Sequence, residues 1–198
     1  EHGSGSFHGS ISGGGISIEN VQNINIIKCL IQNNRVTGDG GGIYTETSNT
    51  YLSGITICSN QAYKKGGGIF ALSSQIAFDS LNLCNIYLNY SSEGTDIYKL
   101  SFGDPIHLVL DTFTVASPDY YYLFSYAGAG PPGNDISYQI NTGKIVAVSQ
   151  DVYVAPWGNN GNSGLNPGQP LKEISFALLK IQSDSISPDT IHLADGIY

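Results

Sequence analysis

The chain has 198 residues and a formal net charge of −8, and only 12% of its residues are charged. With so few cationic side chains and no basic stripe, the chain is not expected to bind nucleic acid or anionic membranes. No run of 18 apolar residues occurs, which excludes a transmembrane helix. Asn, Ser, Thr, Gly and Tyr supply the polarity, a mixture typical of β-structure with many turns.

A glycine triplet followed by isoleucine recurs along the first half of the chain. Gly13–Gly15, Gly40–Gly42 and Gly66–Gly68 begin at spacings of 27 and 26, and Gly94-Thr95-Asp96-Ile97 is a degenerate fourth copy. Units of this length with short Ile-rich runs suit single coils of a solenoid, which bury their apolar faces only when stacked. The sequence therefore predicts an all-β fold, a right-handed parallel β-helix with coils about 4.8 Å apart.

Residues at equivalent positions of the coils are expected to form columns along the solenoid axis. We predict a column of inward isoleucines, a column of cysteines as buried thiols, and a column of asparagines that exchange amide hydrogen bonds at a turn. Their members are Ile16, Ile43, Ile69 and Ile97; Cys29, Cys58 and Cys84; and Asn34, Asn60 and Asn89. A disulfide between neighbouring coils is the alternative for the cysteines. Cysteines outside consecutive layers would argue against the coil period.

The charged residues of the coils provide one candidate catalytic pair. Glu19 and Glu46 lie 27 residues apart, so neighbouring coils would place their carboxylates side by side, as a polysaccharide hydrolase requires. Asp39, Lys65 and Glu93 each precede a glycine corner and predict a surface column of alternating charge, which contributes little to stability. No spacing of metal ligands indicates a metal site, and no cofactor is predicted.

These repeats resemble those of a known family. The pattern of GGGI, an asparagine-containing turn and a second GGGI, over roughly residues 10–100, is similar to the repeats of polymorphic outer-membrane-protein-type surface proteins. The turn Cys58-Ser59-Asn60 is compressed relative to the family pattern, and Tyr90 and Ser91 replace its usual small pair. The resemblance implies a right-handed β-helix that serves as an autotransported or otherwise secreted adhesin.

Residues 104–150 are expected to form a β-rich closing or connecting unit. Strands are predicted at Ile106–Leu110, Thr112–Val115, Tyr120–Phe124, Ile136–Ile140 and Lys144–Val148. They suit either a small antiparallel β-region or strands that wrap and close the solenoid. A cluster of Tyr120, Tyr121, Tyr122 and Tyr126 is interpreted as a half-buried strand face, with stacking on sugar rings as the alternative.

Residues 151–198 show a strand, a polar loop, a helix and a second strand. The strands are expected at Val152–Val154 and Thr190–Leu193, and Pro170 is expected to open the amphipathic helix. The predicted apolar stripe of this helix consists of Leu171, Ile174, Leu178 and Ile181. The run from Tyr153 to Tyr198 resembles the cap and first coil that open pectate-lyase-like β-helix domains. The chain is thus divided into coils (1–103), a closing unit (104–150) and the start of a following β-helix (151–198).

Together these features predict a non-catalytic structural or adhesive element of a large secreted or cell-surface protein. With no signal peptide and no methionine, the chain is expected to be a piece of something longer. Uncovered coil edges at Ser10–Ile18 and Thr190–Tyr198 predict head-to-tail self-association or stacking on adjacent coils, giving filaments. A glycan or host-cell surface ligand is the other expected partner. The alternative is a carbohydrate-binding or polysaccharide-cleaving, pectate-lyase-like module that uses Glu19 and Glu46.

Overall fold

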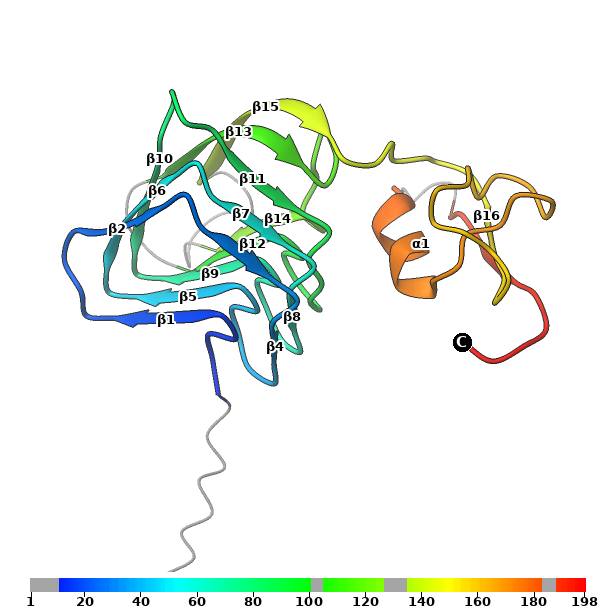
Figure 1. Cartoon of the computed structure of the whole chain (residues 1–198), viewed down its shortest axis with the longest axis horizontal. Helices are drawn as coiled ribbons and strands as arrows, with labels where there is room; N and C mark the ends of the chain where they lie inside the picture. Colours follow the sequence, from blue (N-terminus) through cyan, green and yellow to red (C-terminus); the bar gives the residue numbers. More distant parts are fainter. Residues whose placement is uncertain (1–10, 101–104, 127–134, 183–187) are drawn as a thin grey trace, which may run out of the picture.

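The chain folds into a stack of β-coils followed by a short helical cap. The computed structural model describes residues 11–100, 105–126, 135–182 and 188–198. Strands from successive coils lie side by side and form three parallel sheets around the stack (Figure 1). The predicted fold class, an all-β parallel β-helix with one short helix, is therefore confirmed.

The three sheets are named here A, B and C. Sheet A consists, in spatial order, of β1 (Ile16–Glu19), β5 (Ile43–Glu46), β9 (Ile69–Leu72), β12 (Ile97–Leu100) and β14 (Leu123–Tyr126). Sheet B consists of β2 (Ile24–Ile27), β6 (Asn49–Ser53) and β10 (Gln75–Phe78). Sheet C consists of β3 (Leu30–Gln32), β7 (Thr56–Cys58), β11 (Cys84–Tyr87), β13 (Ile106–Phe113) and β15 (Ile136–Gly143). A shorter pair, β4 (Arg35–Val36) and β8 (Gln61–Ala62), lines one corner.

The predicted isoleucine column is present on the inner side of sheet A. Ile16 pairs with Ile43, Ile43 with Ile69, and Ile69 with Ile97, always in parallel register. Ile43, Ile69 and Ile97 are at most 1% exposed, whereas Ile16 lies on the outermost strand and is half-buried. The column prediction is confirmed. The burial of the isoleucines explains why the coils stack, because each isoleucine is shielded from water only when the next coil covers it.

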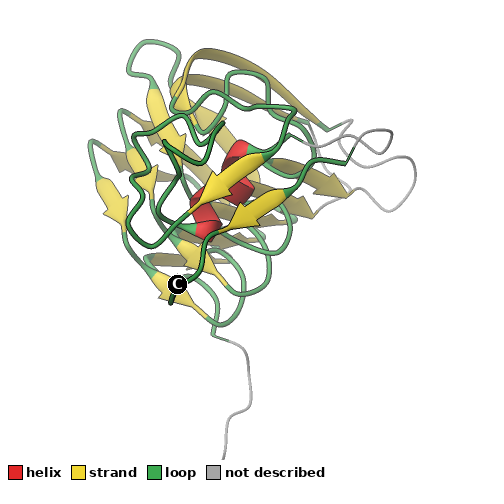
Figure 2. Cartoon of the chain, turned by 90° about the vertical axis from the view of Figure 1, so that its right-hand side faces the viewer, coloured by secondary structure: helices red, strands yellow, loops and turns green. Residues whose placement is uncertain are grey.

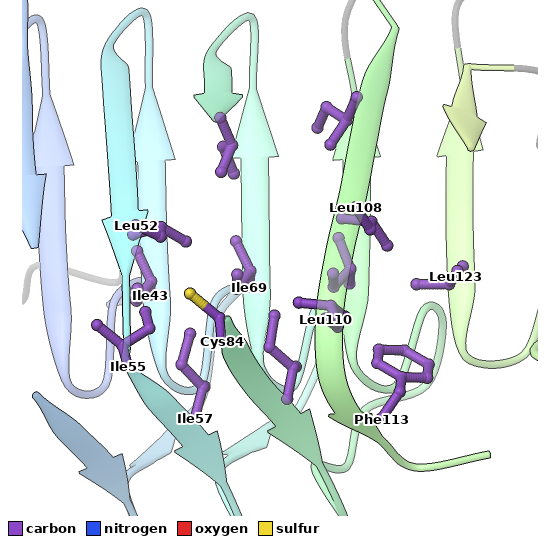
Figure 3. Packing of buried hydrophobic residues seen from close by; sticks show 14 of the residues in the cluster. Ile43, Leu52, Ile55, Ile57, Ile69, Cys84, Leu108, Leu110, Phe113 and Leu123 are labelled. Atoms are coloured by element: carbon purple, nitrogen blue, oxygen red, sulfur yellow. The ribbon is translucent and has the colours of Figure 1, made fainter. Parts of the chain in front are cut away.

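Side chains from sheets B and C fill the rest of the interior. Figure 3 shows Leu52 of sheet B and Ile57 and Leu110 of sheet C facing the isoleucines across the stack, and each of these three residues is fully buried. Because each coil contributes only a few apolar side chains, this core is continuous along the stack and belongs to no single coil.

The described residues 105–126 and 135–143 continue the stack with strands that pair in parallel. β13 pairs in parallel with β11 and β15, and β14 pairs in parallel with β12. The predicted small antiparallel β-region is therefore wrong, and the alternative of strands that wrap around the solenoid is correct. The predicted runs Ile106–Leu110 and Ile136–Ile140 are strands, whereas Lys144–Val148 is not. The runs did not indicate the direction of pairing, because parallel and antiparallel strands share the same in–out alternation.

The helical cap contains β16 (Val152–Val154), α1 (Ile174–Lys180) and β17 (Ile191–Leu193), and the two strands pair in parallel. The helix begins at Ile174 and not at Pro170, because Leu171 extends and bridges to Val154. The predicted stripe is partly wrong, since Leu178 is 50% exposed. Ala177 and Leu179 are the buried residues of the helix.

The helix α1 lies between the two-stranded cap sheet and the stacked coils (Figure 2). Ala177 packs with Val152 and Val154 in a small separate core, whereas Leu179 joins the main core of the stack. The hydroxyl of Tyr122, which is fully buried, donates a hydrogen bond of 2.7 Å to the carbonyl oxygen of Leu179. The cap is thus fastened to the last coil of the stack by both apolar and polar contacts.

Candidate functional site

The asparagine column is present and holds one corner of the stack together. The side-chain amide of Asn34 donates to Oδ1 of Asn60 at 2.9 Å, and that of Asn60 donates to Oδ1 of Asn89 at 3.1 Å. Each Oδ1 also accepts the backbone N–H of the preceding asparagine in the column. The prediction is confirmed, and the amides satisfy backbone groups that the sharp corner would otherwise leave unpaired.

The column ends on a carboxylate that the sequence analysis did not single out. Asp96 Oδ1 accepts 2.9 Å and 3.3 Å hydrogen bonds from the amide and backbone nitrogens of Asn89. Asp96 occupies the position that Gly68 occupies one coil earlier. The N–H of Ile43 donates to the carbonyl oxygen of Gly68, and in the next coil the N–H of Ile69 donates in the same way to the carbonyl oxygen of Asp96. The next coil has Ala116, three residues beyond Phe113, where an asparagine would be. Asp96 therefore takes over as the final acceptor.

The signal for this role was present in the sequence. The fourth copy of the repeat replaces a glycine with Asp96, and no asparagine follows at the coil spacing. In the earlier coils a side chain at this position is excluded: a Cβ on Gly68 would lie 3.0 Å from the amide nitrogen of Asn89 and 2.5 Å from the carbonyl oxygen of Asp96. An aspartate fits only where the amide column stops.

Burial raises the pKa of Asp96 to about 7, although hydrogen bonds from Thr114 and Asn89 oppose the shift. Because the folded-state pKa lies above the unfolded value, the contribution of this group to stability is complete below about pH 4 and is lost as the pH rises through 7. We expect the Asp96→Asn variant to lack this pH-dependent loss of stability. At pH 8 its free energy of unfolding should exceed that of the wild type by on the order of 3 kcal/mol. Urea unfolding of both proteins from pH 5 to 8 measures the difference, and parallel profiles would refute the assignment.

The predicted cysteine column is not formed. Cys58 and Cys84 are buried, as expected, but Cys29 is exposed and all three are free thiols. Cys58 pairs with Gln32 and Tyr87, not with another cysteine. The disulfide alternative is also not realised in the structure.

Unequal coil lengths explain this error. On sheet C, Leu30 pairs with Thr56 and Thr56 with Asn85, which gives spacings of 26 and then 29. The cysteines are spaced 29 and then 26, so they fall out of register in both steps. The extra residues lie in the corner before β11, where Leu81 is 90% exposed instead of belonging to an apolar run. The coils still stack, because the isoleucine register does not depend on this corner.

The two carboxylates predicted as a pair lie on neighbouring strands. Glu19 of β1 and Glu46 of β5 are direct register partners on the outer face of sheet A. Each carboxylate accepts a hydrogen bond from a hydroxyl of its own strand, from Ser17 at 3.1 Å and from Tyr44 at 2.7 Å respectively. The pKa of Tyr44 is raised, first by burial and then by its bond to Glu46. The two acids are thus brought together by the strand register, and each is hydrogen-bonded within its own strand.

An aromatic column, which the sequence analysis missed, runs beside these acids. The rings of Tyr44, Phe70, Tyr98 and Phe124 stack with centroid separations of 5.4, 5.4 and 4.9 Å and nearly parallel planes. The signal was the residue after each repeated isoleucine, which is aromatic in the second, third and fourth copies. Because neighbouring rings cover each other and Tyr44, Phe70 and Tyr98 are at most 9% exposed, the column stabilises the stack and offers little free ring surface.

The charged column at the glycine corner is formed in part. Lys65 Nζ lies 3.3 Å from Glu93 Oε2, donates to the Tyr98 hydroxyl at 3.0 Å and lies 4.6 Å from the Tyr98 ring centroid. Burial raises the pKa of Asp39, while Lys64 and Lys65 partly offset the shift. The predicted alternation therefore places a cation against the aromatic column.

The tyrosine cluster after residue 119 separates into two environments. Tyr122 is fully buried and fastens the cap, whereas Tyr120, Tyr121 and Tyr126 are 59%, 36% and 45% exposed. Tyr121 and Tyr122 pack edge to face at 5.3 Å. The interpretation as a strand face is wrong for Tyr120, Tyr121 and Tyr122, which lie in the turn before β14, and only Tyr126 lies on that strand.

Two segments of the chain match a family model. Residues 28–46 and 54–72 match the Chlamydia polymorphic membrane protein repeat. Each segment runs from a strand of sheet C, through the asparagine turn and the glycine triplet, to a strand of sheet A. No curated protein and no solved structure matches the chain. Within the described residues, no helix is long and apolar enough to cross a membrane. The chain is a parallel β-helix protein in which two consecutive coils match the Chlamydia polymorphic membrane protein repeat.

Proposed function

We propose that the chain is a non-catalytic structural or adhesive element of a large cell-surface or secreted protein. The observation that carries the proposal is the match of two membrane-protein repeats to two consecutive coils of the stack. Such repeats build an extended body whose sheets present long outer faces, a geometry suited to holding or displaying contact surfaces. The low charge of the chain and its many Asn, Ser and Thr residues fit an extracellular setting.

A polysaccharide-cleaving module is the alternative, and the register of Glu19 with Glu46 is the observation that favours it. Neighbouring strands lie about 4.8 Å apart, close to the roughly 5 Å between the carboxyl groups of retaining glycosidases. Against it, both acids lie on an outer sheet face, and each carboxylate already accepts a hydrogen bond from a hydroxyl of its own strand.

The test uses the whole chain coupled to beads. We expect the beads to adhere to cultured animal cells, to release no reducing ends from acidic or neutral polysaccharides, and to behave identically after Glu19→Gln or Glu46→Gln. Beads carrying an unrelated acidic protein are the control. Reducing ends that disappear in either variant would establish the alternative, and wild-type beads that adhere no better than the control would contradict the adhesive role.

End-to-end assembly is part of the proposal, with a second copy of the chain as the partner. Among the described residues, β1, β2 and β3 each have a sheet neighbour on one side only, and β17 pairs only with β16. Leu193 and Ile197 are 52% and 94% exposed beside β17. Strand edges with nearby apolar groups favour pairing between copies. Electron microscopy of the same preparation at high concentration should show fibres or short stacks, and dispersed monomers would oppose this part.

A further inference from the structure

The outer face of sheet B carries a shallow groove of about 230 Å³ that crosses the first three coils. No charged side chain lines it. Its lining includes four amide side chains, one tyrosine ring and one alanine methyl group, from Asn23, Asn25, Asn49, Gln75, Tyr51 and Ala77. The face thus differs from sheet A, where acids and stacked rings occupy the same coils.

The Tyr51 ring is placed so that one of its faces is accessible. In the parallel register of sheet B, Tyr51 lies between Asn25 of β2 and Ala77 of β10. The methyl group of Ala77 is too small to cover the ring, and Tyr51 is 37% exposed. On sheet A, by contrast, neighbouring rings such as Tyr44 and Phe70 cover each other at 5.4 Å. Tyr51 therefore offers the aromatic face that the sheet A column does not.

Polar contacts fix the groove before any ligand arrives. The Tyr51 hydroxyl donates a hydrogen bond to Asp79, and the pKa of Tyr51 is raised first by burial and then by this bond. Asp79 is itself held by the Ser53 hydroxyl at 2.7 Å and by the Asn82 amide at 2.9 Å. The amide of Asn49 donates to Gln22 Oε1 at 2.8 Å, which fixes the orientation of the Asn49 side chain. An orientation fixed in this way lowers the entropy lost on binding.

We propose that this groove binds a neutral saccharide, one sugar ring packing its apolar C–H face on Tyr51 over Ala77. Amide side chains both donate and accept, so they match adjacent hydroxyl groups of a sugar. The uncharged lining and the net charge of −8 disfavour acidic saccharides. The groove is smaller than the roughly 300–1,000 Å³ of pockets that enclose a drug-sized ligand, so it contacts part of an extended chain. This inference deepens the proposed adhesive function and rests on it.

The experiment titrates the isotopically labelled chain with neutral hexasaccharides of β-linked glucose, mannose and galactose, and with hexagalacturonate as the acidic comparison. Amide chemical shifts of β2, β6 and β10 should move with at least one neutral probe and not with the acidic one. Tyr51→Ala should weaken that binding by about tenfold or more. Ala77→Leu fills the space over the ring without removing a polar group and should weaken it comparably. Tyr63→Ala, which removes a tyrosine that is 76% exposed on a different surface, should leave it unchanged.

The outcomes separate this inference from the adhesive role. Unmoved sheet B amides with every neutral probe, or wild-type affinity in both Tyr51→Ala and Ala77→Leu, would overturn the groove assignment. If the wild-type beads adhere to cells but no neutral probe moves the sheet B amides, the groove is refuted while adhesion stands. If saccharide binding follows the variants but no beads adhere, the groove stands and the adhesive proposal fails.

Discussion

Replacing Asn60 with alanine should lower the free energy of unfolding by about 4 kcal/mol. Asn60 is fully buried in the middle of the asparagine column, and its side chain bonds to Asn34, Asn89 and the carbonyl of Ile31. The substitution leaves the backbone N–H and the amide of Asn34 and the Ile31 carbonyl without their partner. Each unsatisfied buried polar group costs about 1–3 kcal/mol. Urea unfolding followed by circular dichroism measures the loss.

The matched control is Asn25→Ala, which removes an exposed amide from the outer face of β2. Its free energy of unfolding should stay within about 0.5 kcal/mol of the wild type. Asn60→Asp should be nearly as damaging as Asn60→Ala, because a carboxylate of the same size cannot donate to Asn89 or Ile31. If Asn60→Ala cost less than about 1 kcal/mol, the column would be a consequence of the fold and not one of its supports.

Replacing Gly42 with alanine should destabilise the chain by about 3 kcal/mol or more. A Cβ on Gly42 would lie 2.6 Å from the Gly68 carbonyl oxygen, 2.8 Å from Cγ2 of Ile57 and 3.1 Å from the amide nitrogen of Asn60. Two of these neighbours belong to the core or the asparagine column, so relief requires moving the next coil away. Overpacking of this kind costs about 1–3 kcal/mol where the neighbours are side chains, and more against backbone. Thermal unfolding of the variant provides the measurement.

Gly54→Ala separates this clash from the conformational preference of glycine. Gly54 has a φ of +59°, but a Cβ there would meet nothing closer than Lys28 Cγ at 3.7 Å. The free energy of unfolding of this variant should therefore fall only by the cost of holding a residue other than glycine in the left-handed conformation, about 1 kcal/mol. Equal losses for Gly42→Ala and Gly54→Ala would mean that backbone conformation, and not the contact between coils, requires the glycine triplet.

The sequence was sufficient to predict those columns whose members lie next to a fixed landmark. Ile16, Ile43, Ile69 and Ile97 directly follow the glycine corner or its degenerate copy, so the register there cannot drift. The cysteines are separated from that landmark by two corners of variable length. The predicted cysteine column is absent for that reason, although the parallel β-helix fold that the column was meant to test is correct. A repeated residue is a reliable register marker only when no insertion lies between it and the landmark.

Other features depend on contacts between distant parts of the chain. Lys99 lies in β12 between Ala71 and Ser125 of the neighbouring strands and is fully buried, with Nζ 3.6 Å from Asp135 Oδ2. Burying a lysine is unfavourable without a partner charge, so the sequence alone favours an outward side chain. The candidate groove on sheet B was equally hidden, because Tyr51, Asn25 and Ala77 meet only through the strand register.

The corner between β10 and β11 shows what the coils tolerate. It contains the residues that lengthen one coil from 26 to 29 on sheet C, yet the strands on both sides keep their neighbours. Its tip, Leu81, is 90% exposed. A peptide epitope grafted at this tip would therefore be displayed away from the body without altering any column beneath it. The inner columns repeat from coil to coil, whereas the corners tolerate changes of length and sequence. A binding surface at a corner can therefore change without altering the fold of the stack.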